Sequence, residues 1–98
     1  MDVNNIKLGE RIIDRCEAMC RSVEEMSDDD FSVTFSINMY GTAMKTEFAR
    51  PYGLLFEDIK ALVDREGIAD EQRQQIYGAY GSISKKIRER ILSSQNNS

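Results

Sequence analysis

The first hydrophobic pattern along the chain is helical and covers residues 6–26. Its apolar side chains recur at steps of three or four residues, which places them on one face of an α-helix. Gly9 lies in the first turn, where a glycine costs roughly 1 kcal/mol relative to alanine, so a start at Gly9 also fits the pattern. The apolar members of this stripe are Leu8, Ile12, Cys16, Met19, Val23 and Met26.

The period then changes to two, which is typical of a β-strand with one buried face. The alternating apolar residues are Phe31, Val33, Phe35, Ile37 and Met39. A two-residue turn at Tyr40-Gly41 predicts a hairpin, although tyrosine suits a turn position with positive φ poorly, and a longer loop through Thr42 is an alternative. The two-residue turn would give the cross-strand pairs Ile37–Met44, Phe35–Thr46 and Val33–Phe48.

A proline-containing segment after the hairpin predicts a turn over residues 50–53, because Pro51 has a fixed φ and no N–H to donate to a strand. A short amphipathic helix should follow it. Gly67 is expected to end that helix in the left-handed conformation, and Asp70 is expected to cap the next one. The apolar residues of the short helix are Leu55, Ile59, Leu62 and Val63.

The last helical pattern extends from Glu71 to about Leu92, a length of about 33 Å at 1.5 Å per residue. Its apolar stripe is followed by polar residues 93–98, which we expect to fray. Gly78 and Gly81 thin this helix and would let another backbone approach closely, either from the first helix or from a second subunit. The stripe consists of Ile76, Tyr80, Ile83, Ile87 and Ile91.

Together these patterns predict one α+β domain over residues 1–98, in the order α-β-β-α-α. A helix, a two-stranded antiparallel β-hairpin, a short helix and a long C-terminal helix follow one another. A hairpin alone is marginal in water, so we expect its apolar face to lie on the first and last helices. A chain of this length cannot divide its apolar residues between two cores.

The chain contains no histidine, which removes the side chain that most often acts as a general base near neutral pH. Cys16 and Cys20 lie on or beside an apolar stripe, where burial raises a thiol pKa. Their spacing could supply half of a four-cysteine zinc site across a two-fold axis, but packing as small buried hydrophobes is the stronger interpretation. Asp28, Asp29 and Asp30 lack the spacing of a calcium loop. We therefore expect no catalytic residue, no metal and no cofactor.

The net charge of −4 is unevenly distributed along the chain. Residues 1–49 carry 5 basic and 10 acidic side chains, whereas residues 50–98 carry 8 basic and 7 acidic ones. An acidic protein is a poor general ligand for phosphate backbones, which makes nucleic acid the less favoured partner. The exception is a basic cluster near the C-terminus, although cations there also complement the helix dipole. The cluster consists of Lys85, Lys86, Arg88 and Arg90.

No basic leader with a continuous apolar core opens the sequence, and no apolar run approaches 18 residues. Two cysteines inside a helical pattern are typical of reduced thiols. These features predict a cytoplasmic protein without a membrane-spanning segment.

These observations favour a non-catalytic protein-binding module, such as a small inhibitor or adaptor of a larger intracellular protein of the kind that mobile genetic elements carry. The expected partner-binding site is the tip and exit of the hairpin, at Tyr40, Lys45, Arg50 and Tyr52. Tyrosine and arginine often anchor interfaces. The alternative interpretation is that Tyr40 and Tyr52 cover the core.

The alternative function is binding of a small anionic ligand or nucleic acid, through the basic C-terminal cluster or through Lys45 and Arg50. A homo-oligomer is also expected. The last helix is longer than a small globule needs, and one hairpin leaves two strand edges to cover.

Overall fold

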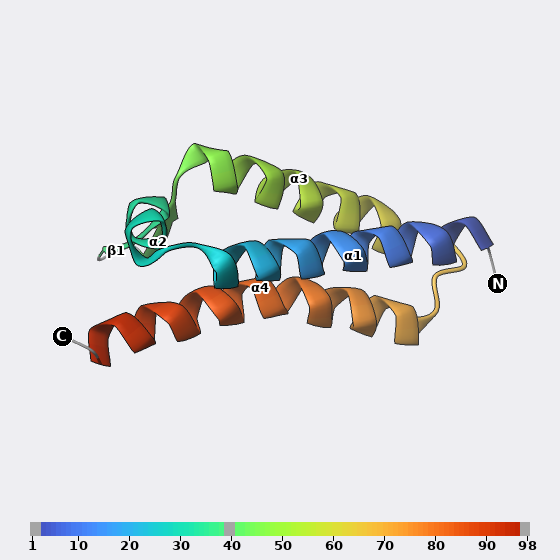
Figure 1. The fold of residues 1–98 in the computed structure, drawn as a ribbon. Helices are drawn as coiled ribbons and strands as arrows, with labels where there is room; N and C mark the ends of the chain where they lie inside the picture. The colour runs from blue at the N-terminus through green and yellow to red at the C-terminus, as the bar shows by residue number, and fades with distance from the viewer. Residues whose placement is uncertain (1–2, 39–40, 97–98) are drawn as a thin grey trace.

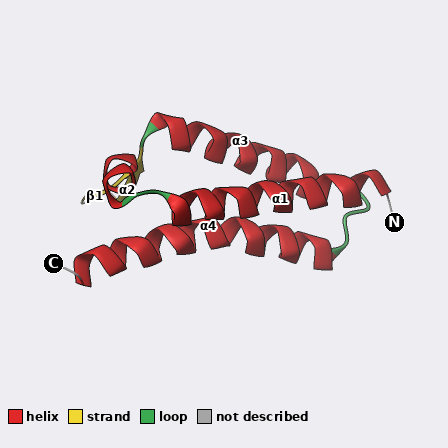
Figure 2. Ribbon diagram, in the orientation of Figure 1, coloured by secondary structure: helices red, strands yellow, loops and turns green. Residues whose placement is uncertain are grey.

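The computed structural model describes residues 3–38 and 41–96, and in this part of the chain it is mostly helical. Two long helices, α1 (Val3–Glu25) and α4 (Asp70–Asn96), run in the same direction, and α3 (Thr46–Val63) returns between them in the chain order (Figure 1). A short helix, α2 (Asp28–Thr34), and a small hairpin lie at the far end (Figure 2). The α+β layout is present, but helix dominates more than the sequence predicts.

The molecule is elongated, with principal dimensions of 51 × 21 × 20 Å. Its radius of gyration is 15.2 Å, compared with roughly 13 Å for a compact domain of this length. The three long helices therefore form a rod, and each helix has one face in contact with the others and one face exposed to solvent.

The predicted strand over residues 31–39 is wrong in its first half, because residues 28–34 form α2. Ser27 caps this helix by accepting a hydrogen bond from the backbone N–H of Asp30 at 3.1 Å. Phe31 and Phe35 are four residues apart and so share one face in a helix as well as in a strand, which is why the alternation was ambiguous. Both are buried, whereas Val33, expected on the same face, is 66% exposed.

The hairpin is shorter than predicted and has a different register. Strand β1 (Phe35–Asn38) pairs antiparallel with β2 (Gly41–Met44), and Phe35 lies opposite Met44. The predicted register paired Phe35 with Thr46, which is wrong because Thr46 begins α3. The predicted pairs Ile37–Met44 and Val33–Phe48 fail with it, and the predicted turn residue Tyr40 and strand residue Met39 lie outside the described residues.

The turn predicted over residues 50–53 is also wrong, because Arg50, Pro51, Tyr52 and Gly53 all lie inside α3. Pro51 cannot donate the helical hydrogen bond expected at its position. Before the proline, Phe48 packs on Phe35 of β1 at a ring distance of 4.7 Å, and after it Tyr52 packs on Tyr80 of α4 at 5.0 Å. These tertiary contacts hold the first turns helical despite the proline.

The connection between α3 and α4 follows the sequence prediction in part. Gly67 has the predicted left-handed conformation, with a φ of +85°, and Ile68 after it is buried. Gly67 does not end the helix itself, because α3 ends at Val63 with Asp64 as its cap, and Asp70, predicted as a cap, is the first residue of α4. Helix α4 continues through Ser93 to Asn96, into the segment that we expected as a polar tail.

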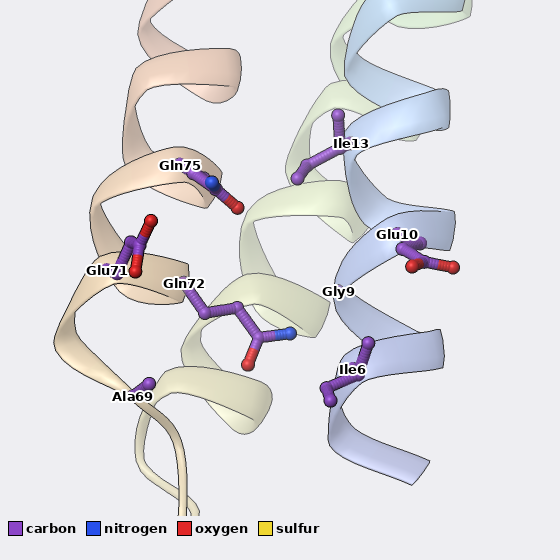
Figure 3. Close-up of a pocket in the computed structure, with 8 residues that line it drawn as sticks. All are labelled: Ile6, Gly9, Glu10, Ile13, Ala69, Glu71, Gln72 and Gln75. Carbon is purple, nitrogen blue, oxygen red and sulfur yellow. The ribbon is translucent and has the colours of Figure 1, made fainter. Parts of the chain in front are cut away.

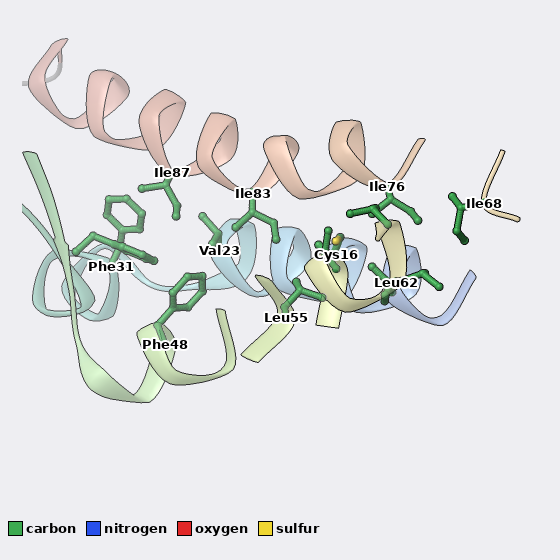
Figure 4. Close-up of a cluster of buried hydrophobic side chains, with 14 residues drawn as sticks. Cys16, Val23, Phe31, Phe48, Leu55, Leu62, Ile68, Ile76, Ile83 and Ile87 are labelled. Carbon is green, nitrogen blue, oxygen red and sulfur yellow. The ribbon is translucent and has the colours of Figure 1, made fainter. Parts of the chain in front are cut away.

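The core runs along the rod, between α4 on one side and α1 with α3 on the other (Figure 4). Every third or fourth residue of the predicted helical stripes contributes to it, so the stripes of the first and last helices are confirmed. Its least exposed side chains are Cys16, Val23, Leu55, Ile59, Ile76 and Ile83.

Truncation of Phe35 tests the junction between α2 and the hairpin. Phe35 is 4% exposed and packs against Phe31 and Phe48 at ring distances of 5.0 and 4.7 Å. Phe35→Ala should therefore lower the free energy of unfolding by about 3–5 kcal/mol, whereas Ser36→Ala, at an exposed position, should change it little. Chemical denaturation of both variants measures the difference, and a larger loss for Ser36→Ala would contradict the assignment of faces.

Candidate functional site

The four residues expected to form a site at the hairpin do not share one surface loop. Tyr40 lies outside the described residues. Lys45 precedes α3 as an exposed residue without a side-chain capping bond, and Arg50 is exposed on the helix itself. Tyr52 is half-buried, and its hydroxyl group lies 3.1 Å from Oγ of Ser84 on α4. For Tyr52, this placement matches the alternative interpretation that it covers the core.

Tyr52 belongs to a continuous row of aromatic rings that the sequence reasoning missed. From Phe35 the row passes through Phe48 and Tyr52 to Tyr80 of α4, at a Tyr52–Tyr80 ring distance of 5.0 Å. Phe56 then contacts Tyr80 at 5.8 Å. The row begins in the core beside the hairpin and ends at the surface where α3 meets α4.

We call the surface end of this row the aromatic seam, formed by Tyr52, Phe56, Tyr77 and Tyr80. Phe56 is 43% exposed and Tyr77 is 53% exposed, although both are large apolar rings. Tyr77 lies three residues before Tyr80 and so shares its side of α4. Burial, followed by the hydrogen bond with Tyr52, raises the pKa of Tyr80, so its hydroxyl stays neutral and can donate or accept a hydrogen bond.

The seam has a basic border. Lys60 lies one turn after Phe56, with its Nζ 5.6 Å from the centre of the Phe56 ring. On α4, Arg73 lies one turn before Tyr77, and Arg88 continues the same stripe through Tyr80 and Ser84. Arg73 is paired with Asp70 at 3.1 Å, whereas Lys60 and Arg88 form no ion pair with any described residue, in a chain whose net charge is −4.

Half of the predicted basic cluster at the C-terminus is engaged in the fold. Lys86 forms a 2.7 Å ion pair with Glu24, and this hydrogen bond raises the pKa of Lys86. Arg90 donates to the carbonyl of Val23 at 2.6 Å, pairs with Asp28 at 3.2 Å and covers the ring of Phe31. Arg90 thereby satisfies a free carbonyl at the end of α1.

The other two cations of the cluster, Lys85 and Arg88, are exposed. The cluster predicted from the sequence therefore divides into two pairs. Lys86 and Arg90 connect α4 to the end of α1 and the start of α2, whereas Lys85 and Arg88 face solvent.

The surroundings of the two thiols keep them protonated and so disfavour a role as nucleophiles. Cys16 is fully buried, and burial raises its pKa to about 11. Burial also raises the pKa of Cys20, which is partly exposed. A buried Cys16 cannot reach a metal shared with a second subunit without repacking the core. Within residues 3–38 and 41–96, no group of three or more histidine, cysteine or acidic residues is arranged to hold a metal ion.

The glycines of α4 have open surroundings in the described structure. A Cβ placed on Gly78 or Gly81 would have no described neighbour within 4 Å, so no other described helix of this chain packs closely against either glycine. The close approach occurs instead at Gly9 of α1, where a Cβ would collide with the amide of Gln72. Gln72 uses this space to donate from Nε2 to the carbonyl of Asn5 at 3.0 Å.

A cavity of about 240 Å³ lies beside this contact, between α1 and α4 (Figure 3). Gln72 reaches across it from α4, while Glu10 and Glu71 stand on its two walls. Its lining is mostly apolar, and its two charged residues are acidic. We assign it no ligand, because Gln72 extends across the cavity to the carbonyl of Asn5.

No protein-family model matches the chain, and no curated protein or solved structure matches it either. Among the described residues, no helix combines the length and apolar character needed to cross a membrane. The interpretation of function therefore depends on the surfaces described above.

Alkylation tests the different environments of the two thiols. Each unit by which a pKa rises above the ambient pH lowers the reactive thiolate fraction about tenfold. Because Cys16 is also fully buried and Cys20 is partly exposed, iodoacetamide at mildly alkaline pH should modify Cys20 at least about tenfold faster than Cys16, as followed by peptide mass spectrometry. In denaturant the two rates should converge, and equal rates in the native protein would contradict the burial of Cys16.

Proposed function

We propose that this protein is a non-catalytic binding module that acts on a larger protein as an inhibitor or adaptor, and that the aromatic seam is its contact surface. The observation that carries the proposal is the joint exposure of Phe56 and Tyr77 where α3 meets α4. Aromatic side chains and arginine dominate the binding energy of protein interfaces, because they combine a large contact area with directional polar groups.

The chemistry of the seam selects an amphipathic acidic segment as its occupant. Apolar side chains of the partner would pack between Phe56 and Tyr77, and carboxylates would lie on Lys60 and Arg88. Because the whole protein is acidic, this basic border is a local feature and not a consequence of net charge. An acidic amphipathic helix laid along the line where α3 meets α4 would supply both kinds of contact.

Two further features support binding in preference to chemistry. The chain has no histidine, and burial raises the pKa of both thiols, so the most common general base is absent and the thiol nucleophiles stay protonated. The alternative of anion or nucleic-acid binding through the C-terminal cluster is weakened, because Lys86 and Arg90 are held by Glu24 and Asp28. Only Lys85 and Arg88 would be left to contact phosphates there.

Substitution of the seam tests the proposal. The double variant Phe56→Ser with Tyr77→Ser should weaken capture of a native partner from cell extract at least about tenfold, because it removes the central aromatic contacts. The matched control is Val33→Ser with Leu54→Ser, which removes two apolar side chains that are more exposed than those of the seam (66% and 58% exposed) and lie elsewhere on the molecule. Quantitative mass spectrometry of the captured proteins compares the three forms.

The charge reversal Arg88→Glu should weaken capture further, and rising salt should do the same, if the partner is acidic. Melting temperatures of all variants establish that they are folded. A partner captured equally by the seam variant and the wild type would rule the seam out as the contact surface, as would equal losses in the control.

Self-association is a separate prediction that we do not assign to the seam. A rod with several exposed apolar side chains is expected to bury some of them against a second copy. Sedimentation velocity over a wide concentration range should therefore give a mass near twice 11.2 kDa. A constant monomer mass would contradict this prediction without affecting the seam.

A further inference from the structure

A groove with a volume of about 380 Å³ lies between α3 and α1, on the opposite side of α3 from the aromatic seam. Its floor is apolar: Ile12 and Leu62 are buried there, and Leu8 lies half-buried one turn before Ile12. This volume falls within the range of roughly 300–1,000 Å³ that is typical of small-molecule sites.

Three arginines line the groove, and we call it the arginine groove. Arg11 and Arg15 are one turn apart on α1, and Arg65 follows the end of α3. The only carboxylate among its lining residues is Asp58, so the lining carries three positive charges and one negative charge. This excess of positive charge over an apolar floor occurs in a chain whose net charge is −4.

The three guanidinium groups differ in how far they are satisfied. Arg15 donates to the Asp58 carboxylate at 2.7 Å, with both side chains about half exposed. Arg65 makes a longer contact of 3.3 Å to the amide oxygen of Asn5. Within residues 3–38 and 41–96, Arg11 forms no hydrogen bond or ion pair. The groove thus has guanidinium N–H groups that lack a described acceptor, and the Asp58 carboxylate shows that a carboxylate can bind there.

We propose that the arginine groove binds an aliphatic carboxylate. The chain of the ligand lies on Leu8, Ile12 and Leu62, and its carboxylate accepts from Arg11 and from Arg15 or Arg65. Guanidinium groups match carboxylates in geometry and form charge-assisted hydrogen bonds with them. Asp58 acts as an internal competitor for Arg15, because its carboxylate occupies a donor that the ligand would use. This site is independent of the aromatic seam, which lies between α3 and α4.

The probe is octanoate, titrated into the full chain and followed through the methyl NMR signals of Leu8, Ile12 and Leu62. Octanoate should shift these signals saturably, whereas acetate, which lacks the chain, and octanol, which lacks the charge, should bind at least about tenfold more weakly. Equal binding of octanol would show that the arginines take no part, and it would overturn the proposal.

Two substitutions separate the ligand site from the fold. Asp58→Asn frees Arg15 and should strengthen octanoate binding roughly threefold to tenfold, while an exposed ion pair of this kind adds little stability. Arg11→Gln should weaken octanoate binding by a similar factor without lowering the melting temperature, since Arg11 has no described partner to lose.

The matched control is Lys7→Gln, which removes one exposed positive charge from the same helix outside the groove lining. It should leave octanoate affinity unchanged. The proposal is overturned if octanoate causes no saturable shift at the groove methyls, or if Lys7→Gln weakens binding as much as Arg11→Gln. Partner capture through the seam is measured with different variants, so either proposal can fail alone.

Discussion

The packing of α4 along α1 is the contact on which the rest of the structure depends. Ile76, Ile83 and Ile87 present one continuous face of α4, and Cys16 and Val23 of α1 meet it without solvent between them. Because the two helices run in the same direction, the chain must travel back along their full length before α4 can begin (Figure 1). Helix α3 provides that return, and the hairpin with α2 provides the reversal at the far end.

This connection creates the two surfaces to which we assign binding. Helix α3 contacts α1 on one flank, where the arginine groove lies, and α4 on the other flank, where the aromatic seam lies. On the α4 flank, aromatic rings fill the contact and Phe56 is left partly in solvent. On the α1 flank, arginines line the arginine groove above its apolar floor, and one of them, Arg15, forms an ion pair with Asp58. One returning helix therefore separates an aromatic surface from a cationic one.

The distribution of the cations follows from the same geometry. Lys86 and Arg90 project from α4 toward the end of α1, where Glu24 and Asp28 and the free carbonyl of Val23 accept their hydrogen bonds. Lys60 and Arg88 form no ion pair with any described residue. Cations that are alike in sequence thus divide into those that join helices and those that remain available to a partner, and only their surroundings distinguish them.

The sequence alone determined the elements whose signal is local. Helical periodicity placed the first and last helices, and the lack of a Cβ identified Gly67 as a left-handed residue in the turn between α3 and α4. The sequence could not decide the structure of residues 28–34, because Phe31 and Phe35 share a face in a helix and in a strand alike. It could not decide residues 50–53 either, because the packing of Phe48 on Phe35 and of Tyr52 on Tyr80 overrides the effect of Pro51. The sequence alone could not predict the aromatic seam or the arginine groove either. Phe56 meets Tyr80, and Arg15 meets Asp58, across helices that are distant in sequence, and such contacts exist only once the core has fixed how the helices lie together.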